Sequence, residues 1–174
     1  MNRGILVAIC LLIGTLAYGC SPGPKSGSNL PPLASPVPVS SSTQVVKLAS
    51  SPLTITRNGS AEAVVTLTIT PGYHINANPA SFPYLIATEL QPGKLDGITP
   101  GKPVYPSPVT RKFEFAEEPL AVYEGEALIK LPLRAASPAQ DQFLMPIKVR
   151  VQACDNEKCF PPAMIESSIP VKLN

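Results

Sequence analysis

The chain has few of the residues from which metal sites and acid–base sites are usually built. Among its 174 residues there are one histidine, four cysteines and no tryptophan. One histidine cannot form a His-based zinc site, and Cys154 and Cys159, the two cysteines outside the N-terminal segment, cannot complete an all-thiolate site with four ligands. The formal net charge is only +2 and no basic cluster is present, which argues against nucleic acid as a partner. We therefore expect no cofactor, no metal site and no nucleic-acid partner.

Long apolar runs are missing too, except at the N-terminus. A short positive start is followed by the apolar stretch Gly4 to Ala17, which is shorter than the ~20 residues of a membrane span and suits a secretory signal. We expect residues 1–19 to be this signal. The segment ending in Cys20 resembles a bacterial lipoprotein box, in which the cysteine is acylated and anchors the mature chain to a membrane. Ordinary signal cleavage and free secretion are the alternative, and either route leads to export, where disulfides persist.

A tether is expected to follow the signal. Between residues 21 and 43, Ser, Pro and Gly fill 15 of 23 positions, so this segment cannot build a core. We assign residues 20–43 to the tether and residues 44–174 to one folded domain, which is long enough to bury a core.

The folded part has a period of two, without long stretches of helical spacing. In 63–70, the apolar Val65, Leu67 and Ile69 alternate with threonines, and the same alternation recurs in three further segments: 127–133, 143–153 and 165–173. Shorter candidate strands are 44–48, 53–56, 84–90 and 111–115, and Pro-Gly, Asn-Gly and Asp-Gly pairs mark turns. The pattern predicts an all-β protein, an immunoglobulin-like antiparallel β-sandwich of about seven to nine strands.

Strand parity bears on the two cysteines. If the strand that begins at Phe143 continues to Cys154, this thiol shares the solvent face with Lys148 and Arg150 and is accessible. A bridge to Cys159 would close a loop with four residues between its ends. The chain-entropy estimate for such a loop is only about 2 kcal/mol, and an exposed, local bridge is easily reduced. A surface staple and a working redox pair both remain open on these grounds.

The residues around the cysteines resemble a known family. The string Val-Gln-Ala-Cys-Asp-Asn-Glu-Lys-Cys-Phe-Pro-Pro (151–162) is similar to the active-site hairpin of the N-terminal periplasmic domain of the thiol:disulfide interchange protein DsbD. The stretch Gly-Tyr-His-Ile-Asn-Ala-Asn-Pro (72–79), followed by Tyr84 and Leu85, resembles a second segment common in this family. The resemblance extends over about residues 44–174.

The resemblance implies an immunoglobulin-like fold with an exchanging dithiol/disulfide pair, Cys154 and Cys159. In the family, this domain takes electrons from a membrane-embedded transporter and passes them to periplasmic thioredoxin-like proteins, including those of cytochrome c biogenesis. A cap loop shields the pair and opens for partners. Its counterpart is expected within 113–123, and the residues expected over or near the disulfide are Phe115, Pro119, Leu120 and Tyr123.

Two other functions remain open at this stage. The first is a non-enzymatic immunoglobulin-like binding or assembly module in which the disulfide only stiffens a loop. The second is a copper-handling protein that uses both cysteines and Met164, because soft sulfur ligands suit Cu(I). Lys158 and the acidic residues around it predict ordinary thiol acidity. His74 is expected to have a hydrogen-bonded structural role.

Overall fold

The computed structural model describes residues 38–136 and 141–174, which form an immunoglobulin-like β-sandwich. This part of the chain has one short 3-10 helix, η1 (Ser42–Gln44), and twelve strands: β1 (Val46–Ser50), β2 (Leu53–Ile55), β3 (Ser60–Ile69), β4 (His74–Asn76), β5 (Glu89–Pro92), β6 (Ile98–Pro100), β7 (Val109–Arg111), β8 (Leu120–Tyr123), β9 (Glu126–Ala135), β10 (Gln142–Val151), β11 (Ala153–Cys154) and β12 (Ala163–Leu173). The all-β immunoglobulin-like fold expected from the sequence is confirmed.

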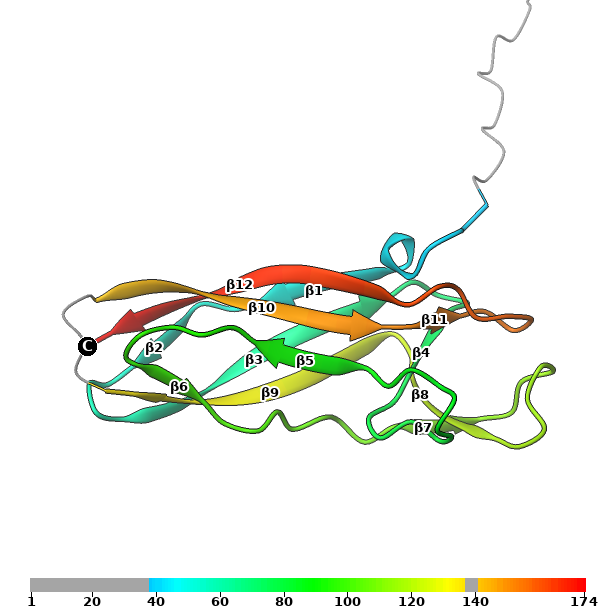
Figure 1. Cartoon of the computed structure of the whole chain (residues 1–174), viewed down its shortest axis with the longest axis horizontal. Coiled ribbons are helices and arrows are strands. Elements are labelled where there is room, and N and C mark those ends of the chain that lie inside the picture. The colour runs from blue at the N-terminus through cyan, green and yellow to red at the C-terminus, as the bar shows by residue number, and fades with distance from the viewer. Residues whose placement is uncertain (1–37, 137–140) are drawn as a thin grey trace, which may run out of the picture. The chain divides into compact units, whose positions relative to one another are not determined.

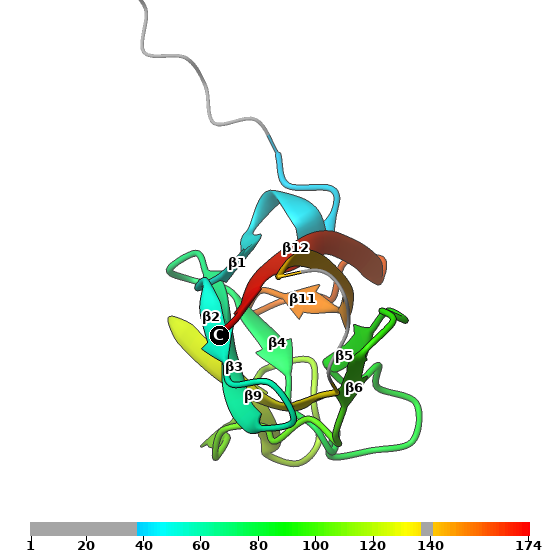
Figure 2. The same ribbon diagram turned by 90° about the vertical axis from the view of Figure 1, so that its left-hand side faces the viewer.

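Three four-stranded sheets build the domain. The strand orders are β1-β3-β9-β6, β2-β12-β10-β5 and β11-β4-β8-β7. Viewed along the strands, the first two sheets curl around the core (Figure 2). The third sheet lies at one end of the sandwich, and the C-terminus lies at the other end (Figure 1). One pair departs from the antiparallel arrangement, because β12 and β2 pair in parallel.

The inward stripes read from the sequence form the core. Val65, Leu67 and Ile69 of β3 are buried, and β9 contributes the complementary stripe, with Val65 directly opposite Ile129. The facing sheet buries alternate residues of β10 and β12 in the same way. Because side chains alternate between the two faces of a strand, one apolar stripe per long strand is sufficient to fill the space between the sheets.

The short strands differ most from expectation. Of the segments 84–90 and 111–115, only the ends are strands, because β5 begins at Glu89 and β7 ends at Arg111. The structure also has three strands that were not expected, namely β4, β6 and β8, and the strand expected over 143–153 divides into β10 and β11. Two to four residues are too few to show alternation, which explains why the described part of the chain has twelve strands rather than about seven to nine.

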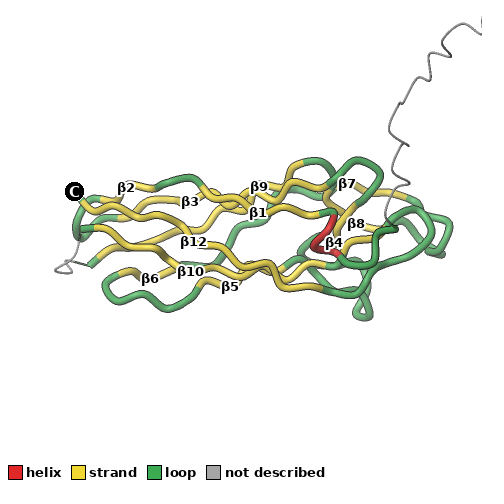
Figure 3. The backbone as a smooth tube through the Cα atoms, turned by 90° about the horizontal axis from the view of Figure 1, so that it is seen from above, coloured by secondary structure: helices red, strands yellow, loops and turns green. Residues whose placement is uncertain are grey.

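The beginning of the described chain is tied to the fold. Ser42 was assigned to the tether but is buried, and Ser41 caps η1 in a capping box with Gln44 (η1 is red in Figure 3). The proposed signal (1–19), the lipidation site Cys20 and the tether up to residue 37 lie outside the described residues. Within residues 38–136 and 141–174, no helix is long and apolar enough to cross a membrane.

Candidate functional site: a disulfide hairpin beneath a loop

The two cysteines form a disulfide across a hairpin at the end of β11. Cys154 and Cys159 pair as an isolated antiparallel bridge with their Cα atoms 3.9 Å apart. Backbone hydrogen bonds flank the bridge on both sides, from Phe160 N to Ala153 O (2.8 Å) and from Asp155 N to the carbonyl of residue 158 (2.9 Å). The cysteines therefore occupy a non-hydrogen-bonded pair, the position where side chains on adjacent strands approach most closely.

Asp155 organises the turn between the cysteines. Its carboxylate oxygen Oδ1 accepts hydrogen bonds from the backbone N–H groups of Glu157 (2.9 Å) and Lys158 (2.8 Å). Partial burial acts to raise the pKa of Asp155, but these two hydrogen bonds and the charge of Lys158 outweigh it and lower the pKa. The ionised carboxylate thus holds the four-residue turn in the shape that brings the sulfur atoms together.

The two cysteines differ in burial, and not as strand parity suggested. Cys154 is fully buried (0% exposed), whereas Cys159 is half-buried. The expectation of an exposed Cys154 was wrong because the chain leaves the outer ladder after Val151. Beyond that point, β11 pairs with the buried strand β4 instead of extending β10. Cys159 is therefore the more accessible of the two cysteines.

Cys159 opens into a cavity beneath the loop between β7 and β8, which we call the cap loop (residues 112–119). Figure 1 shows the cap loop and the disulfide hairpin projecting from the same end of the sandwich. The cavity has a volume of about 290 Å³. Its walls include Cys159 and Gln152 from the hairpin side, Phe115, Ala116 and Leu120 from the cap side, and Tyr84 and Leu85 from the loop before β5.

The four residues expected near the disulfide divide into two pairs. Phe115 (37% exposed) and the buried Leu120 line the cavity with Cys159. Pro119 is exposed and does not line it. Tyr123 belongs to the main core of the sandwich, where its hydroxyl accepts a hydrogen bond from the backbone N–H of Asn78 (3.1 Å). The structure thus brings Phe115 and Leu120, but not Pro119 and Tyr123, to the cavity.

The cap loop has its own small apolar anchor. Phe113, Leu120 and Val122 form a buried cluster distinct from the main core. The ammonium group of Lys112 donates hydrogen bonds to the carbonyl oxygens of Ala116 (2.6 Å) and residue 117, which closes the base of the loop. The loop is therefore held by three buried side chains and a few exposed polar contacts.

His74 is the residue that sequence reasoning missed at this site. It lies 80 positions before Cys154, yet it is the direct partner of Cys154 in the β4–β11 pair. Its ring is 2% exposed and stacks on Phe113 at 3.9 Å between centroids. Burial lowers its pKa to about 4, although Glu124 and Asp155 act in the opposite direction. The expected hydrogen-bonded role is not seen at Nε2, which is buried without a partner.

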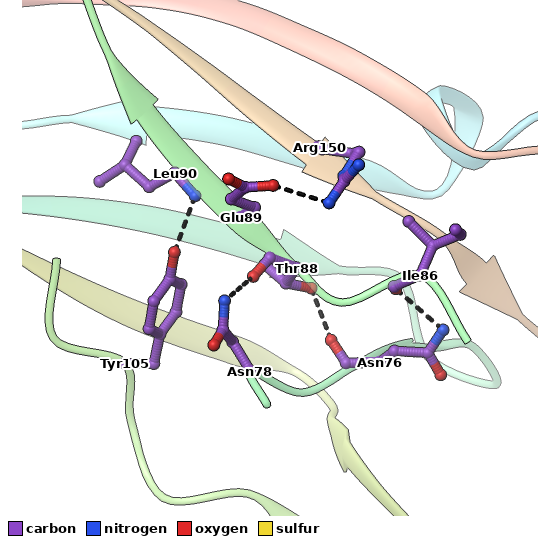
Figure 4. Close-up of polar contacts among 8 residues, drawn as sticks. All are labelled: Asn76, Asn78, Ile86, Thr88, Glu89, Leu90, Tyr105 and Arg150. Carbon is purple, nitrogen blue, oxygen red and sulfur yellow. Dashed lines mark hydrogen bonds and ion pairs between the residues drawn. The ribbon is translucent and has the colours of Figure 1, made fainter. Parts of the chain in front are cut away.

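A polar network supports the base of the hairpin. Gln152 Oε1 accepts hydrogen bonds from Asn76 Nδ2 (3.2 Å) and Ile86 N (3.3 Å), and Asn76 Nδ2 also donates to Ile86 O (3.1 Å). Thr88 Oγ1 donates to Asn76 O (2.6 Å), so the loop before β5 is fastened to β4 (Figure 4).

Figure 4 also shows the contacts that hold β5 itself: Asn78 with Thr88, Tyr105 with Leu90, and Arg150 with Glu89.

Ser42 joins the N-terminal edge of the domain to both limbs of the hairpin. Its hydroxyl oxygen accepts a hydrogen bond from Ala153 N (2.9 Å) and donates one to Pro161 O (2.8 Å). These two residues lie just before Cys154 and just after Cys159. A serine at the end of a Ser/Pro-rich segment gave no sequence signal for this contact.

The described residues contain no group of three or more His, Cys, Asp or Glu residues that could hold a metal ion. Met164, the third ligand of the copper hypothesis, lies on β12 opposite Arg150 with its side chain exposed. It does not line the cavity that contains Cys159.

These features define a class of protein: an immunoglobulin-like sandwich domain with a disulfide hairpin at one end and a cap loop beside it. The family model described as "Thiol:disulfide interchange protein DsbD, N-terminal" matches residues 43–168. The chain belongs to this family, which confirms the resemblance seen in the sequence. A comparison with curated proteins found no match.

Several solved structures are similar to the chain. The reduced N-terminal domain of DsbD from Neisseria meningitidis is 18% identical, with a TM-score of 0.48 over 75% of this chain and 87% of that chain. The N-terminal periplasmic domain of ScsB from Proteus mirabilis is 13% identical, with a TM-score of 0.46 over 73% of this chain and 45% of that one. A complex between the DsbD and PilB N-terminal domains from Neisseria meningitidis is 18% identical, with a TM-score of 0.43 over 62% and 73%.

Proposed function

We propose that the chain is a periplasmic thiol:disulfide exchange module that relays electrons through the Cys154/Cys159 pair. The observation that carries this proposal is the unequal burial of the two sulfur atoms. Cys159 opens into a cavity, while Cys154 is fully buried behind it. A disulfide with one reachable sulfur directs an attacking thiolate to a single site, which orders the two steps of exchange.

The exchange takes two steps. A thiolate of the reduced donor attacks Cys159 Sγ, the Cys154–Cys159 bond breaks, and Cys154 leaves as a thiolate that takes up a proton. The second donor thiol then attacks the donor sulfur of the mixed disulfide and releases Cys159, which is also protonated. The donor dithiol has become a disulfide, and two electrons and two protons now reside on this domain. Delivery to an acceptor disulfide reverses these steps, with Cys159 attacking and Cys154 closing the pair.

The cap loop controls access to Cys159 in this proposal. The small cluster of Phe113, Leu120 and Val122 holds the loop, and Phe115 lies in the cavity wall. Few buried contacts make a segment that opens locally at low free-energy cost. When the cap loop is closed, it protects the disulfide from small thiols. When a partner displaces the loop, the attacking sulfur can reach Cys159.

The partners proposed follow from family membership. The donor is a membrane-embedded electron transporter, and the acceptors are periplasmic thioredoxin-like proteins, with cytochrome c biogenesis as a further destination. Acylation of Cys20 would hold the domain at the periplasmic face of a membrane. The solved complex of DsbD and PilB domains supports this kind of pairing by analogy only.

Trapping with single-cysteine variants tests the proposal. The probe is a thioredoxin whose second active-site cysteine is replaced by serine and whose remaining cysteine is activated as a mixed disulfide with 5-thio-2-nitrobenzoate. Attack by the remaining thiol of this domain releases the aryl thiolate and leaves a mixed disulfide between the two proteins, which accumulates because neither protein retains a second active-site cysteine to resolve it. Cys154→Ser retains the reachable sulfur and is expected to form the mixed disulfide at least about tenfold faster than Cys159→Ser, which retains only the buried one. If neither variant traps the probe, and the disulfide has a potential below about −300 mV, the pair is a structural staple. Stoichiometric copper in the purified protein, measured by mass spectrometry, would instead favour copper handling.

A further inference from the structure

His74 carries a buried polar atom that no described residue of the oxidised protein satisfies. Its Nε2 is one of three buried side-chain nitrogen or oxygen atoms without a hydrogen-bond partner in the described part of the chain. The ring is enclosed, with Phe113 stacked on one face at 3.9 Å and Phe115 further out at 6.4 Å. An unpaired buried polar group costs free energy, and such groups recur where a redox or catalytic step requires them.

The imidazole is neutral at physiological pH. Burial lowers its pKa to about 4 despite the nearby carboxylates of Glu124 and Asp155. A neutral imidazole has one protonated nitrogen and one acceptor nitrogen. With the proton on Nδ1, Nε2 is an acceptor that lacks a donor.

The reacting group directly opposite His74 across the strand pair is Cys154. His74 and Cys154 are directly opposite in the β4–β11 pair, whereas Ile75 and Ala153, the next pair, belong to the main core. Directly opposed residues project from the same face of a sheet, with Cβ atoms about 4.5–5.5 Å apart. The imidazole and the buried sulfur are therefore neighbours on the face that the cap loop covers.

The sulfur changes its hydrogen-bonding capacity in the redox step. In the disulfide, Cys154 has no hydrogen to donate. Reduction adds two electrons and two protons to the pair, and one proton resides on Cys154 Sγ as an S–H donor. The unpaired Nε2 of His74 can accept a hydrogen bond from this S–H group, and both groups are buried.

We propose that His74 accepts a hydrogen bond from the Cys154 thiol in the reduced domain and thereby stabilises the dithiol relative to the disulfide. The inference rests on the proposed function, because the hydrogen bond would set the equilibrium between dithiol and disulfide in the exchanging pair. The same contact keeps the buried thiol oriented toward β4 while Cys159 remains the sulfur that attacks an acceptor. Loss of the acceptor nitrogen shifts the equilibrium toward the disulfide.

The test measures the equilibrium of the domain with the glutathione couple at about pH 7, with thiols counted by alkylation and mass spectrometry. His74→Phe keeps an aromatic ring against Phe113 but has no acceptor. It is expected to shift the equilibrium constant toward the disulfide by about threefold to tenfold, the worth of one modest hydrogen bond; tenfold corresponds to about 30 mV. His74→Gln restores a polar acceptor and is expected to lie between wild type and His74→Phe.

Tyr105→Phe is the matched control. It removes a hydroxyl that accepts a hydrogen bond from Leu90 N (2.9 Å), away from the disulfide, and is expected to leave the equilibrium constant unchanged. An equilibrium constant of His74→Phe within about twofold of wild type, or shifted toward the dithiol, overturns the inference. If His74→Phe does not fold, His74→Leu, which also lacks an acceptor, takes its place, and an equilibrium constant within about twofold of wild type overturns the inference equally.

Failure of this inference differs from failure of the proposed function. Cys154→Ser has no thiol at position 154, so trapping through Cys159 does not depend on a hydrogen bond from the Cys154 thiol to His74. Trapping without a shift in His74→Phe leaves the exchange function and rejects the role of His74. A shift without trapping leaves a hydrogen bond in a protein that does not exchange with the thioredoxin probe.

Discussion

Ser42→Ala removes the hydrogen bonds that join the N-terminal edge of the domain to the disulfide hairpin. The hydroxyl of Ser42 contacts both limbs, through Ala153 N and Pro161 O. The two contacts are not equal in energy. Ala153 is fully buried, so its N–H would lose its partner without access to water, whereas Pro161 is exposed and its carbonyl can be hydrated. The cost is therefore that of one buried unsatisfied donor, about 1–3 kcal/mol.

The redox state should change the size of the effect. In the oxidised protein, the Cys154–Cys159 bond also holds the limbs together, and its loop-closure contribution is about 2 kcal/mol. In the reduced protein, Ser42 and the hairpin hydrogen bonds do so alone. We expect Ser42→Ala to destabilise the reduced form more than the oxidised form, with a coupling of about 0.5–1 kcal/mol, as is typical for groups that share one structural element.

Urea unfolding of both redox forms measures these values, with oxidised samples kept free of thiols. Ser107→Ala, an exposed serine in the loop before β7, is the control and should change the free energy of unfolding by less than about 0.5 kcal/mol. The reasoning is refuted if Ser42→Ala is as mild as Ser107→Ala in both forms. Equal destabilisation of the two forms would refute the coupling alone.

Two further predictions concern the cap loop and pH. Phe115→Ala removes part of the cavity wall beside Cys159, so dithiothreitol should reduce the disulfide several-fold faster, at a stability cost of about 1–2 kcal/mol. The control is Leu128→Ala on β9, where the leucine is 47% exposed, and it should leave the rate of reduction unchanged. An unaltered rate in Phe115→Ala would contradict shielding of the disulfide by this residue. For His74, the unfolded pKa of 6.5 exceeds the folded value of about 4, so the unfolded state binds the extra proton between these pH values. Stability should therefore fall by about 2 kcal/mol from about pH 7 to about pH 4.5, and His74→Phe should lose this part of the slope in urea unfolding; an identical slope in both proteins would contradict a buried neutral imidazole.

The long strands could be predicted because their information is local. Val65, Leu67 and Ile69 alternate with threonines, and this period alone assigns them to the interior. The short strands β4, β6, β8 and β11 carry no such period. They are strands because the longer elements leave a backbone edge that they pair with, a tertiary cause that no window of sequence contains.

The site, like the strands, has features that local sequence predicts and features that arise only from tertiary packing. The spacing of Cys154 and Cys159 and the residues around them identified the pair and the family before the fold was known. Accessibility was assigned wrongly, because strand parity assumes that the ladder continues, and after Val151 the chain changes its partner strand. Phe115 and Leu120 were expected near the disulfide from the family resemblance and line the cavity with Cys159.

The sequence by itself determined the all-β class, the cysteine pair and the family. Each depends on residues close together in the chain, through strand period, loop length or a short motif. Only the tertiary structure decided which sulfur is reachable and which residues surround the buried one. His74 and Ser42 lie 80 and 112 residues before Cys154, and only the pairing of β11 with β4 and the docking of η1 bring them to the hairpin. Burial and opposition across strands arise from packing between distant segments, so the chemistry of this disulfide belongs to the fold as much as to its motif.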